Sequence, residues 1–209
     1  MNKKKRYEIL FLFFKNNPNP NTELIFSSAF ELFIAVILSA QSTDIMVNKV
    51  TSILFKVANT PQDILNLGFD KLRHYIKSIG LNNRKASYII NSTLLIINKY
   101  KNQIPSDRCA LESLPGVGRK TANILLNILF QKKTIAVDTH VFRVANRTGF
   151  AKGKNVIDVE KKMLKVVPSL FKKNIHFWFV LHGRYICTAR QLKCKICLIK
   201  KLCEFNKKQ

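Results

Sequence analysis

Residues 114–122 read Leu114-Pro115-Gly116-Val117-Gly118-Arg119-Lys120-Thr121-Ala122, so two glycines stand between an apolar stretch and a basic one. Glycine has no Cβ, and it allows a tight turn with positive φ that other residues enter only with strain. The N–H groups of such a turn can face a phosphate beside a helix N-terminus. A simple helix–helix connection is the alternative, but the flanking residues favour a hairpin that grips a nucleic-acid backbone without reading bases. We expect contacts from Leu114, Gly116, Val117, Gly118 and Arg119.

Lys120 lies in the first turn of the helix predicted over Arg119–Phe130. The positive end of a helix disfavours an ammonium group, and partial burial would disfavour it further. The neutral amine is a nucleophile that can form a Schiff base with an opened sugar. Most lysines are simply surface residues, but the neighbouring hairpin favours a catalytic role for this one.

Asp138 stands between an apolar segment and a further predicted helix. It could be no more than the N-cap of that helix. Capping is compatible with function, because an ionised carboxylate can also polarise a nucleophile or stabilise a developing sugar cation. His140 could act as a general base, although a buried or DNA-contacting histidine is the favoured interpretation.

The rest of the chain predicts one helix after another, because apolar residues recur at spacings of three and four without a strand-like alternation. The segment Ala29–Leu38 is apolar on nearly all sides, with Glu31 the exception, and should be a central buried helix. The sequence therefore predicts an all-α fold. Further helices are expected over Asp44–Val57, Pro61–Leu67, Phe69–Ser78, Arg84–Tyr100, Cys109–Leu114 and Asp158–Val166.

A formal net charge of +24 on 209 residues indicates a polyanionic partner such as DNA, RNA or an acidic membrane surface. AT-rich coding also favours lysine, so the charge supports this interpretation without deciding it. The apolar run from Leu32 to Leu38 is too short to span a bilayer. Residues 1–14 begin like a signal peptide but lack a cleavage site, and we expect an amphipathic helix with a basic face. A cytosolic protein with reduced cysteines follows from this.

Four of the five cysteines, Cys187, Cys194, Cys197 and Cys203, follow the spacing C-x6-C-x2-C-x5-C. Such thiolates suit zinc or an iron–sulfur cluster in a reducing compartment. Zinc is the main alternative, but it usually uses paired C-x2-C knuckles and only one is present. The spacing therefore favours a [4Fe–4S] cluster modestly. Cys109 lies apart on an apolar helix face and is expected to be a small core residue.

Lys193 and Lys195 fall between the cysteines, and residues 184–209 contain a single acid, Glu204. A cluster that folds this loop would hold the two ammonium groups in place for contacts with phosphates. A merely solvated basic tail is the alternative. A structural, DNA-presenting cluster is favoured over a redox centre, while electron transfer stays open.

These features together resemble the endonuclease III family over nearly the whole chain. The resemblance is carried by Leu38-Ser39-Ala40-Gln41-Ser42-Thr43-Asp44, the 114–122 hairpin, Val137-Asp138-Thr139-His140-Val141 with Arg143, Asn146-Arg147, Leu181-His182-Gly183-Arg184 and the cysteine set. One departure is Asn82, which stands where an aromatic residue is expected in the family.

The resemblance implies two helical domains: a six-helix domain with a helix–hairpin–helix motif over 22–132, and an iron–sulfur domain over 1–21 and 133–209. It implies one [4Fe–4S] cluster, a lysine Schiff base on Lys120 activated by Asp138, and flipping of the damaged nucleotide out of the duplex. The expected substrates are oxidised or ring-damaged pyrimidines and abasic sites in double-stranded DNA, cut by β-elimination. A monomer in a bacterial cytosol, associated with the nucleoid, is expected. Further DNA contacts are expected from Gln41, Leu81, His140, Arg143, Arg184, Lys193 and Lys195, with Gln41 and Leu81 filling the vacated space.

Two alternatives stay open at this point. An adenine-mismatch glycosylase of the same superfamily resembles the chain in hairpin and cluster, but it lacks the lysine found here as Lys120. A non-catalytic DNA-binding module could use the same hairpin and basic loop, and it would bind abasic DNA without forming a covalent complex.

Overall fold

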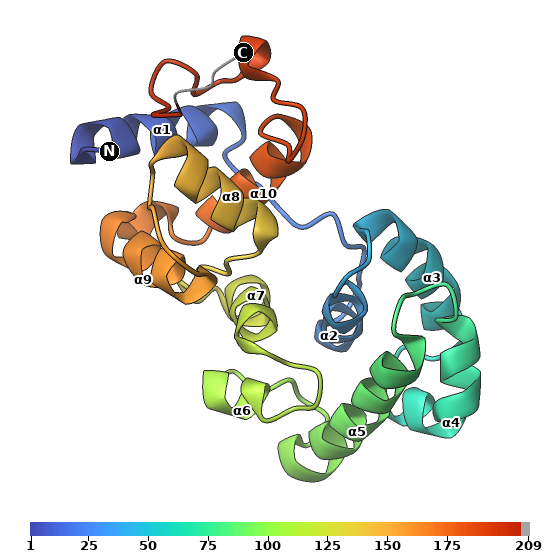
Figure 1. The fold of residues 1–209 in the computed structure, drawn as a ribbon. Coiled ribbons are helices and arrows are strands. Elements are labelled where there is room, and N and C mark those ends of the chain that lie inside the picture. Colours follow the sequence, from blue (N-terminus) through green and yellow to red (C-terminus); the bar gives the residue numbers. More distant parts are fainter. Residues whose placement is uncertain (206–209) are drawn as a thin grey trace. The chain divides into compact units, whose positions relative to one another are not determined.

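A computed structural model of the chain describes residues 1–205 and consists of α-helices joined by short loops (Figure 1). Residues 206–209, the end of the predicted iron–sulfur domain, lie outside the described part. Within residues 1–205 no β-strand forms, and Cys187 and Leu192 make an isolated antiparallel bridge. The prediction of an all-α fold is confirmed.

The chain divides into two compact units. The hairpin unit comprises Glu23–Phe130, and the cysteine unit comprises Met1–Thr22 with Gln131–Gln209. Figure 1 shows that the cysteine unit brings the blue N-terminal helix beside orange and red segments from the far end of the chain.

The hairpin unit is organised around helix α2, Ala29–Leu38. Every residue from Phe30 to Leu38 is buried, and α2 packs against α3, α5 and α7. The buried Glu31 carboxylate accepts a hydrogen bond from the Ser27 backbone at the start of the helix. The expected central buried helix is confirmed. The other helices of this unit are α3 (Asp44–Val57), α4 (Pro61–Tyr75), α5 (Asn82–Tyr100), α6 (Arg108–Glu112) and α7 (Arg119–Phe130).

Two details of the hairpin unit differ from the sequence-based expectations. The two helices expected around residue 68 form the single element α4, which is kinked at Gly68 because that residue has φ of 76°. Cys109 is exposed and not a core residue. The reason is that α6 has only five residues and buries Leu111 alone, so its apolar face is too narrow to include Cys109.

The cysteine unit contains α1 (Lys3–Asn16), α8 (Thr139–Thr148), α9 (Val156–Val166) and α10 (Ile175–Tyr185). Helix α10 was not among the helices expected from the sequence, because its aromatic-rich run Phe177-Trp178-Phe179-Val180 is equally typical of a strand. Helix α1 buries Ile9, Leu10 and Phe13, and the Phe13 ring stacks on Trp178 with centroids 6.2 Å apart. Within the described residues, no helix has the length and apolar character needed to cross a membrane.

Candidate functional site

The 114–122 turn has the geometry of a tight hairpin. The Val117 N–H donates to the Leu114 carbonyl at 3.0 Å, and Gly116 has φ of 81°. A Cβ on Gly116 would lie 2.7 Å from the Tyr88 ring, so both conformation and packing require glycine there. The expectation of positive φ is wrong for Gly118, where a Cβ would meet open space. Because no other atoms lie over Gly118, the backbone of the turn is accessible to a ligand at this residue.

The apolar residues of the hairpin anchor it from inside. Leu114 and Val117 are buried in the core of the hairpin unit, and the Ser92 hydroxyl donates to the Pro115 carbonyl at 2.8 Å. Any contact of Leu114 or Val117 with a nucleic acid therefore has to run through their backbone. Arg119 is exposed and can present its side chain.

Lys120 is exposed in the first turn of α7. The helix begins immediately before it, where the Ala122 N–H donates to the Gly118 carbonyl at 2.9 Å. The partial burial that the sequence left open for Lys120 is not found, because the side chain lies at the surface of the hairpin unit. Its amine is consequently open to a substrate from outside.

Asp138 is the N-cap of α8. Its Oδ1 accepts the Val141 N–H at 2.8 Å, and its carbonyl accepts the Phe142 N–H at 2.8 Å. The side chain is half-buried. One carboxylate oxygen is therefore used in the cap, and the positive end of α8 stabilises the negative charge on the group.

His140 and Arg143 form an internal network one turn further along α8. Arg143 Nη2 lies 3.1 Å from His140 Nδ1 and donates to the Gly183 carbonyl at 2.7 Å, while Arg143 Nε donates to the Cys187 carbonyl at 3.0 Å. Burial lowers the pKa of His140, and the charges of Arg143 and Arg184 lower it further against the opposing effect of Asp138. The imidazole is thus neutral at neutral pH, and Arg143 directs its N–H groups into its own unit.

The four cysteines of the sequence motif line one small pocket in the cysteine unit, together with Arg147 and His182. Arg147 donates to the carbonyls of Thr188 at 2.6 Å and Ala189 at 2.9 Å, which fixes the start of the loop that carries the later cysteines. None of the four takes part in a disulfide bond. The sequence pattern is therefore brought together in space.

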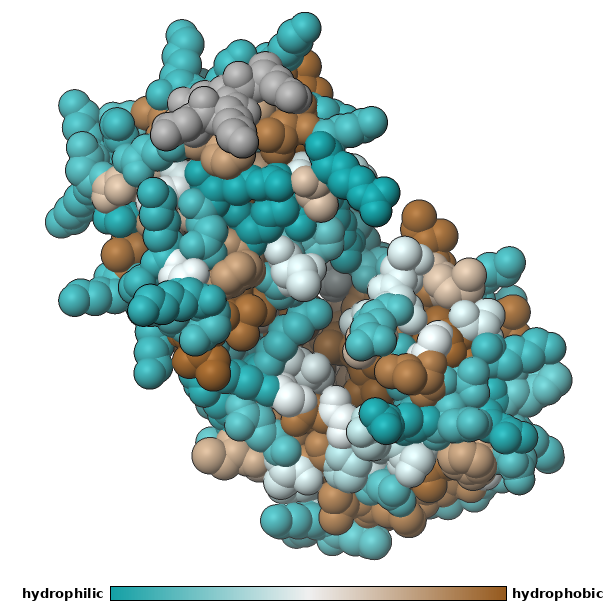
Figure 2. All heavy atoms as spheres, in the orientation of Figure 1, coloured by the Kyte–Doolittle hydropathy of each residue, from teal (hydrophilic) through white to brown (hydrophobic). Residues whose placement is uncertain are grey.

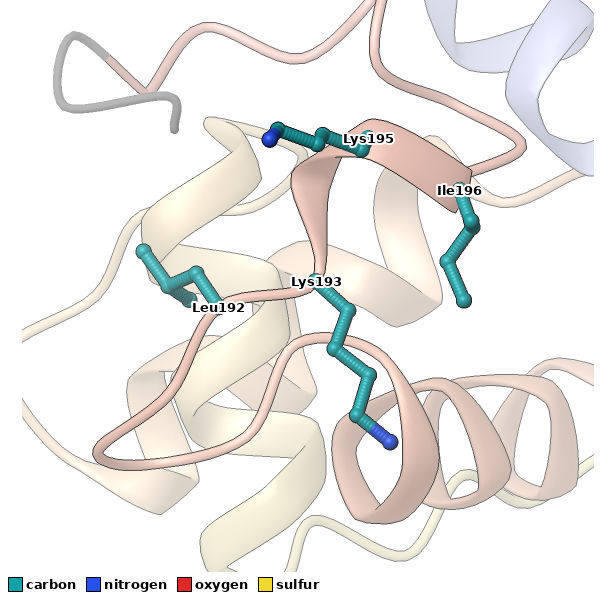
Figure 3. A pocket seen from close by; sticks show the side chains of 4 residues that line it. All are labelled: Leu192, Lys193, Lys195 and Ile196. Atoms are coloured by element: carbon teal, nitrogen blue, oxygen red, sulfur yellow. The ribbon is translucent and has the colours of Figure 1, made fainter.

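Lys193 and Lys195 lie in this cysteine loop, beside a shallow pocket that they line with Leu192 and Ile196. The two ammonium groups extend in different directions from the loop (Figure 3). Long hydrophilic side chains also extend from the rest of the cysteine unit, at the upper left of the space-filling view (Figure 2). The loop can therefore offer two separate positive charges and not one joint binding point.

Gln41 and Leu81 are exposed residues on two neighbouring turns of the hairpin unit. Both have left-handed backbones, with φ of 56° and 60°. A Cβ on Gly80 would lie 4.0 Å from the Gln41 carbonyl, so the two turns are in contact. Asn82, the residue that departs from the expected aromatic, donates its side-chain N–H to the Lys77 carbonyl at 3.2 Å and closes the second turn.

Comparison with known proteins decides the family. Residues 34–169 match a family model described as HhH-GPD superfamily base excision DNA repair protein. The chain is 75% identical over 209 residues to endonuclease III of Buchnera aphidicola subsp. Schizaphis graminum, and the match covers 100% of both proteins. It is 57% identical over 208 residues to endonuclease III of Escherichia coli strain K12, covering 100% of this chain and 99% of the relative. The chain belongs to the endonuclease III family.

A solved structure extends this result from sequence to fold. A trapped covalent intermediate of endonuclease III with DNA superposes with a TM-score of 0.92 at 40% identity, covering 98% of this chain and 96% of the other. As a member of the endonuclease III family, the chain is a base excision repair enzyme that combines DNA glycosylase and abasic-site lyase activities. DNA is accordingly its partner.

The four cysteine side chains that line this pocket of the endonuclease III family member suit a thiolate-bound metal centre, and both zinc and a four-iron cluster use such a donor set. Burial raises the pKa of the Cys197 thiol, and the other three cysteines raise it further. A bound cation would offset this effect, because a thiol that coordinates a cation is deprotonated.

Some residues near the expected DNA contacts were not singled out from the sequence. A polar pocket beside the Leu81 turn is lined by Arg73, His74, Lys77, Asn82 and Asn83. Arg73 and Lys77, four residues apart, could have indicated this basic surface. Lys85 was missed as well, because its hydrogen-bond acceptors lie more than 40 positions away in the sequence.

Proposed function

We propose that Lys120 is the Schiff-base nucleophile and Asp138 the activating carboxylate of an enzyme that removes oxidised or ring-damaged pyrimidines from duplex DNA. The observation that carries this proposal is the placement of Lys120, whose exposed amine follows directly on a hairpin with uncovered backbone at Gly118. A phosphate held by that hairpin would bring the sugar of the same strand close to the amine.

The chemistry follows from these two groups. The lone pair of Lys120 Nζ attacks C1′ of the damaged nucleoside, the bond from C1′ to the base breaks, and the base leaves with the electron pair. The Asp138 carboxylate stabilises positive charge that develops on the sugar, accepts a proton from the attacking amine and passes it to the departing base. The bond from C1′ to the ring oxygen then breaks, the oxygen takes the second proton of the amine, and the imine with the opened sugar results.

The lyase step uses the same imine. Loss of a proton from C2′ expels the 3′ phosphate, which breaks the strand, and water then hydrolyses the imine and returns the free amine of Lys120. The same route serves an abasic site, where no base has to leave. One residue therefore accounts for both activities of the family.

The proposed DNA contacts divide by role. The hairpin residues Gly116, Gly118 and Arg119, with Lys193 and Lys195 in the cysteine loop, contact phosphates and give affinity without base recognition. The exposed side chains of Gln41 and Leu81 fill the space that the extruded nucleotide leaves in the duplex. The neutral His140 and the half-buried Arg184 are assigned to the DNA-facing end of the cysteine unit.

The proposed cofactor is one [4Fe–4S] cluster held by Cys187, Cys194, Cys197 and Cys203. Such a cluster would cross-link the loop and would thereby fold the segment that carries Lys193 and Lys195. We propose that the protein acts as a monomer on chromosomal DNA in the bacterial cytosol.

A borohydride trapping assay tests the proposed activity. Duplexes carry thymine glycol opposite adenine, an abasic site, or adenine opposite 8-oxoguanine, and base release, strand cleavage and covalent complex are measured separately. We expect release, a nick and a trapped complex on the first, a nick and a trapped complex on the second, and no reaction on the third. Binding without cleavage would favour a binding module, and release of adenine would favour the mismatch glycosylase.

An absorption spectrum with iron, sulfide and zinc analysis tests the cofactor. We expect visible absorption and iron with sulfide in the purified protein, and neither in Cys194→Ser. A protein with one zinc and no sulfide would contradict the cluster. Cys109→Ser, which alters the exposed cysteine outside the motif, is the matched control and should leave the spectrum unchanged.

A further inference from the structure

Lys85, on the first turns of α5, is an unusual lysine because its side chain is only 3% exposed. Buried lysines are rare unless their ammonium groups are fully hydrogen-bonded. Lys85 Nζ donates to the Leu38 carbonyl at 2.9 Å, the Ala40 carbonyl at 2.5 Å and the Ser42 hydroxyl at 3.4 Å. Three N–H groups thus meet three uncharged acceptors, all of them on the segment that contains Gln41.

The acceptors show what the ammonium group does. The Leu38 carbonyl belongs to the last turn of α2, where a positive charge complements the negative end of the helix. The Ala40 carbonyl belongs to the peptide unit that joins Ala40 to Gln41, and rotation of this unit sets φ of Gln41. Holding that carbonyl therefore fixes the left-handed conformation from which the Gln41 side chain projects.

The backbone of the same residue acts on the second turn. The Lys85 N–H donates to the Leu81 carbonyl at 2.9 Å, and Leu81 has φ of 60°. That hydrogen bond begins α5 and fixes the peptide unit that follows Leu81. One residue consequently reaches both turns, one through its side chain and the other through its backbone.

We propose that Lys85 is a positioning residue that sets the spacing of Gln41 and Leu81 before DNA arrives. This inference rests on the proposed insertion of these two residues into the duplex. Insertion requires two exposed side chains at a fixed separation, and left-handed backbones would otherwise relax to commoner conformations. Burial lowers the pKa of Lys85. Hydrogen bonds to the three acceptors on the Gln41 segment favour the charged form. A lysine is needed at this position because an apolar side chain could not donate hydrogen bonds to the Leu38 and Ala40 carbonyls.

The test compares double-stranded with single-stranded substrates. Insertion matters only in a duplex, whereas Lys120 can form the Schiff base with abasic DNA that is either double-stranded or single-stranded. We expect Lys85→Met to nick an abasic duplex about tenfold to a hundredfold more slowly in single turnover, with abasic single strands processed within about twofold of the original rate. Lys99→Met, which alters an exposed lysine on the same helix, should change neither rate.

A spectroscopic readout separates positioning from general stability. With 2-aminopurine opposite the abasic site, insertion should unstack the probe and raise its emission, and this rise should be lost in Lys85→Met but kept in Lys99→Met. Equal loss on duplex and single strand, or no loss on either, would overturn the inference. If Lys85→Met does not fold, Lys85→Gln and Ser42→Ala take its place, and the duplex-to-single-strand rate ratio must fall in each that folds.

The last experiment replaces the two residues that are proposed to insert into the duplex. A Gln41→Ala, Leu81→Ala double variant that cleaves duplexes like the original protein would refute the proposed insertion. If that double variant is impaired while Lys85→Met is not, the insertion stands and only the role of Lys85 fails.

Discussion

The starts of α7 and α8, which carry the two proposed catalytic residues, differ in how they treat charge. Helix α8 begins with the Asp138 carboxylate accepting a backbone N–H, which is the arrangement that a helix N-terminus favours. Helix α7 begins with Arg119 and Lys120, two cations at the positive end of the helix. The first start is explained by folding alone, while the second is locally unfavourable. A misfit of this kind indicates a residue retained for its chemistry.

The largest expected effect follows from replacing Lys120 at the start of α7. We expect both Lys120→Ala and Lys120→Arg to lose trapping with borohydride and to nick abasic DNA about a thousandfold more slowly or worse. Arginine is the informative control, because it keeps the charge but has no amine that can form the imine. Single-turnover nicking and gel analysis of trapped complexes measure both. Undiminished trapping in Lys120→Ala would assign the nucleophile to another residue.

At the start of α8, one substitution can separate the capping role of Asp138 from the role of its negative charge. Asp138→Asn retains an oxygen that can accept the Val141 N–H, and we expect turnover to fall about a hundredfold with DNA affinity and melting temperature nearly unchanged. Asp107→Asn is the matched control, because Asp107 caps α6 through Ala110 in the same way. That control should keep full activity. Parallel losses of affinity and turnover in Asp138→Asn would remove the catalytic assignment.

The two glycines that precede α7 give a smaller and more selective effect. Gly116→Ala meets both the positive φ and the Tyr88 ring, and should destabilise the fold by about 1–3 kcal/mol in denaturant unfolding. Gly118→Ala adds a methyl group in open space and should change stability by less than about 0.5 kcal/mol. It should nevertheless weaken DNA binding, because the methyl group stands where a phosphate approaches. Unchanged affinity in Gly118→Ala would place the DNA elsewhere.

The smallest effect is expected where cations contact phosphates and take no part in the chemical step. Lys193→Ala and Lys195→Ala should each reduce the slope of log affinity against log salt by about one, without a change in the rate of the chemical step. Lys161→Ala, on an exposed position of α9 in the same unit, should leave the slope as it is. A cation that contacts no phosphate would give no change, and a joint site for both lysines would make the two effects non-additive.

Segments 44–57 and 119–130 were predictable from their single apolar faces, and segment 29–38 from its continuous apolar run. All three have the limits expected for them, because hydrophobic pattern and capping residues agree there. Helix α10 was not predicted, because its aromatic-rich run is equally typical of a strand. Cys109 was misjudged for a different reason, because an apolar pattern on a five-residue helix does not determine which side is buried.

The candidate site was predictable in its chemistry but less so in its contacts. The lysine, the capping aspartate and the four cysteines are marked by local patterns. The burial of Lys85, the exposure of Lys120 and the internal bonds of Arg143 depend on segments distant in the sequence. No pattern within a window of ten residues could have indicated them.

The cysteine unit is assembled from both ends of the chain, and this has a consequence for synthesis. Helix α1 emerges from the ribosome first, but Phe13 stacks on Trp178, and the Asn17 carbonyl accepts the N–H of that indole at 2.8 Å. At bacterial rates of about 20 residues per second, these partners follow roughly eight seconds later. During that interval residues 23–130 can fold around their own hydrophobic core, while the apolar face of α1 stays exposed to solvent. A nascent chain stalled before residue 178 should therefore be a good substrate for chaperones that bind exposed aromatic segments.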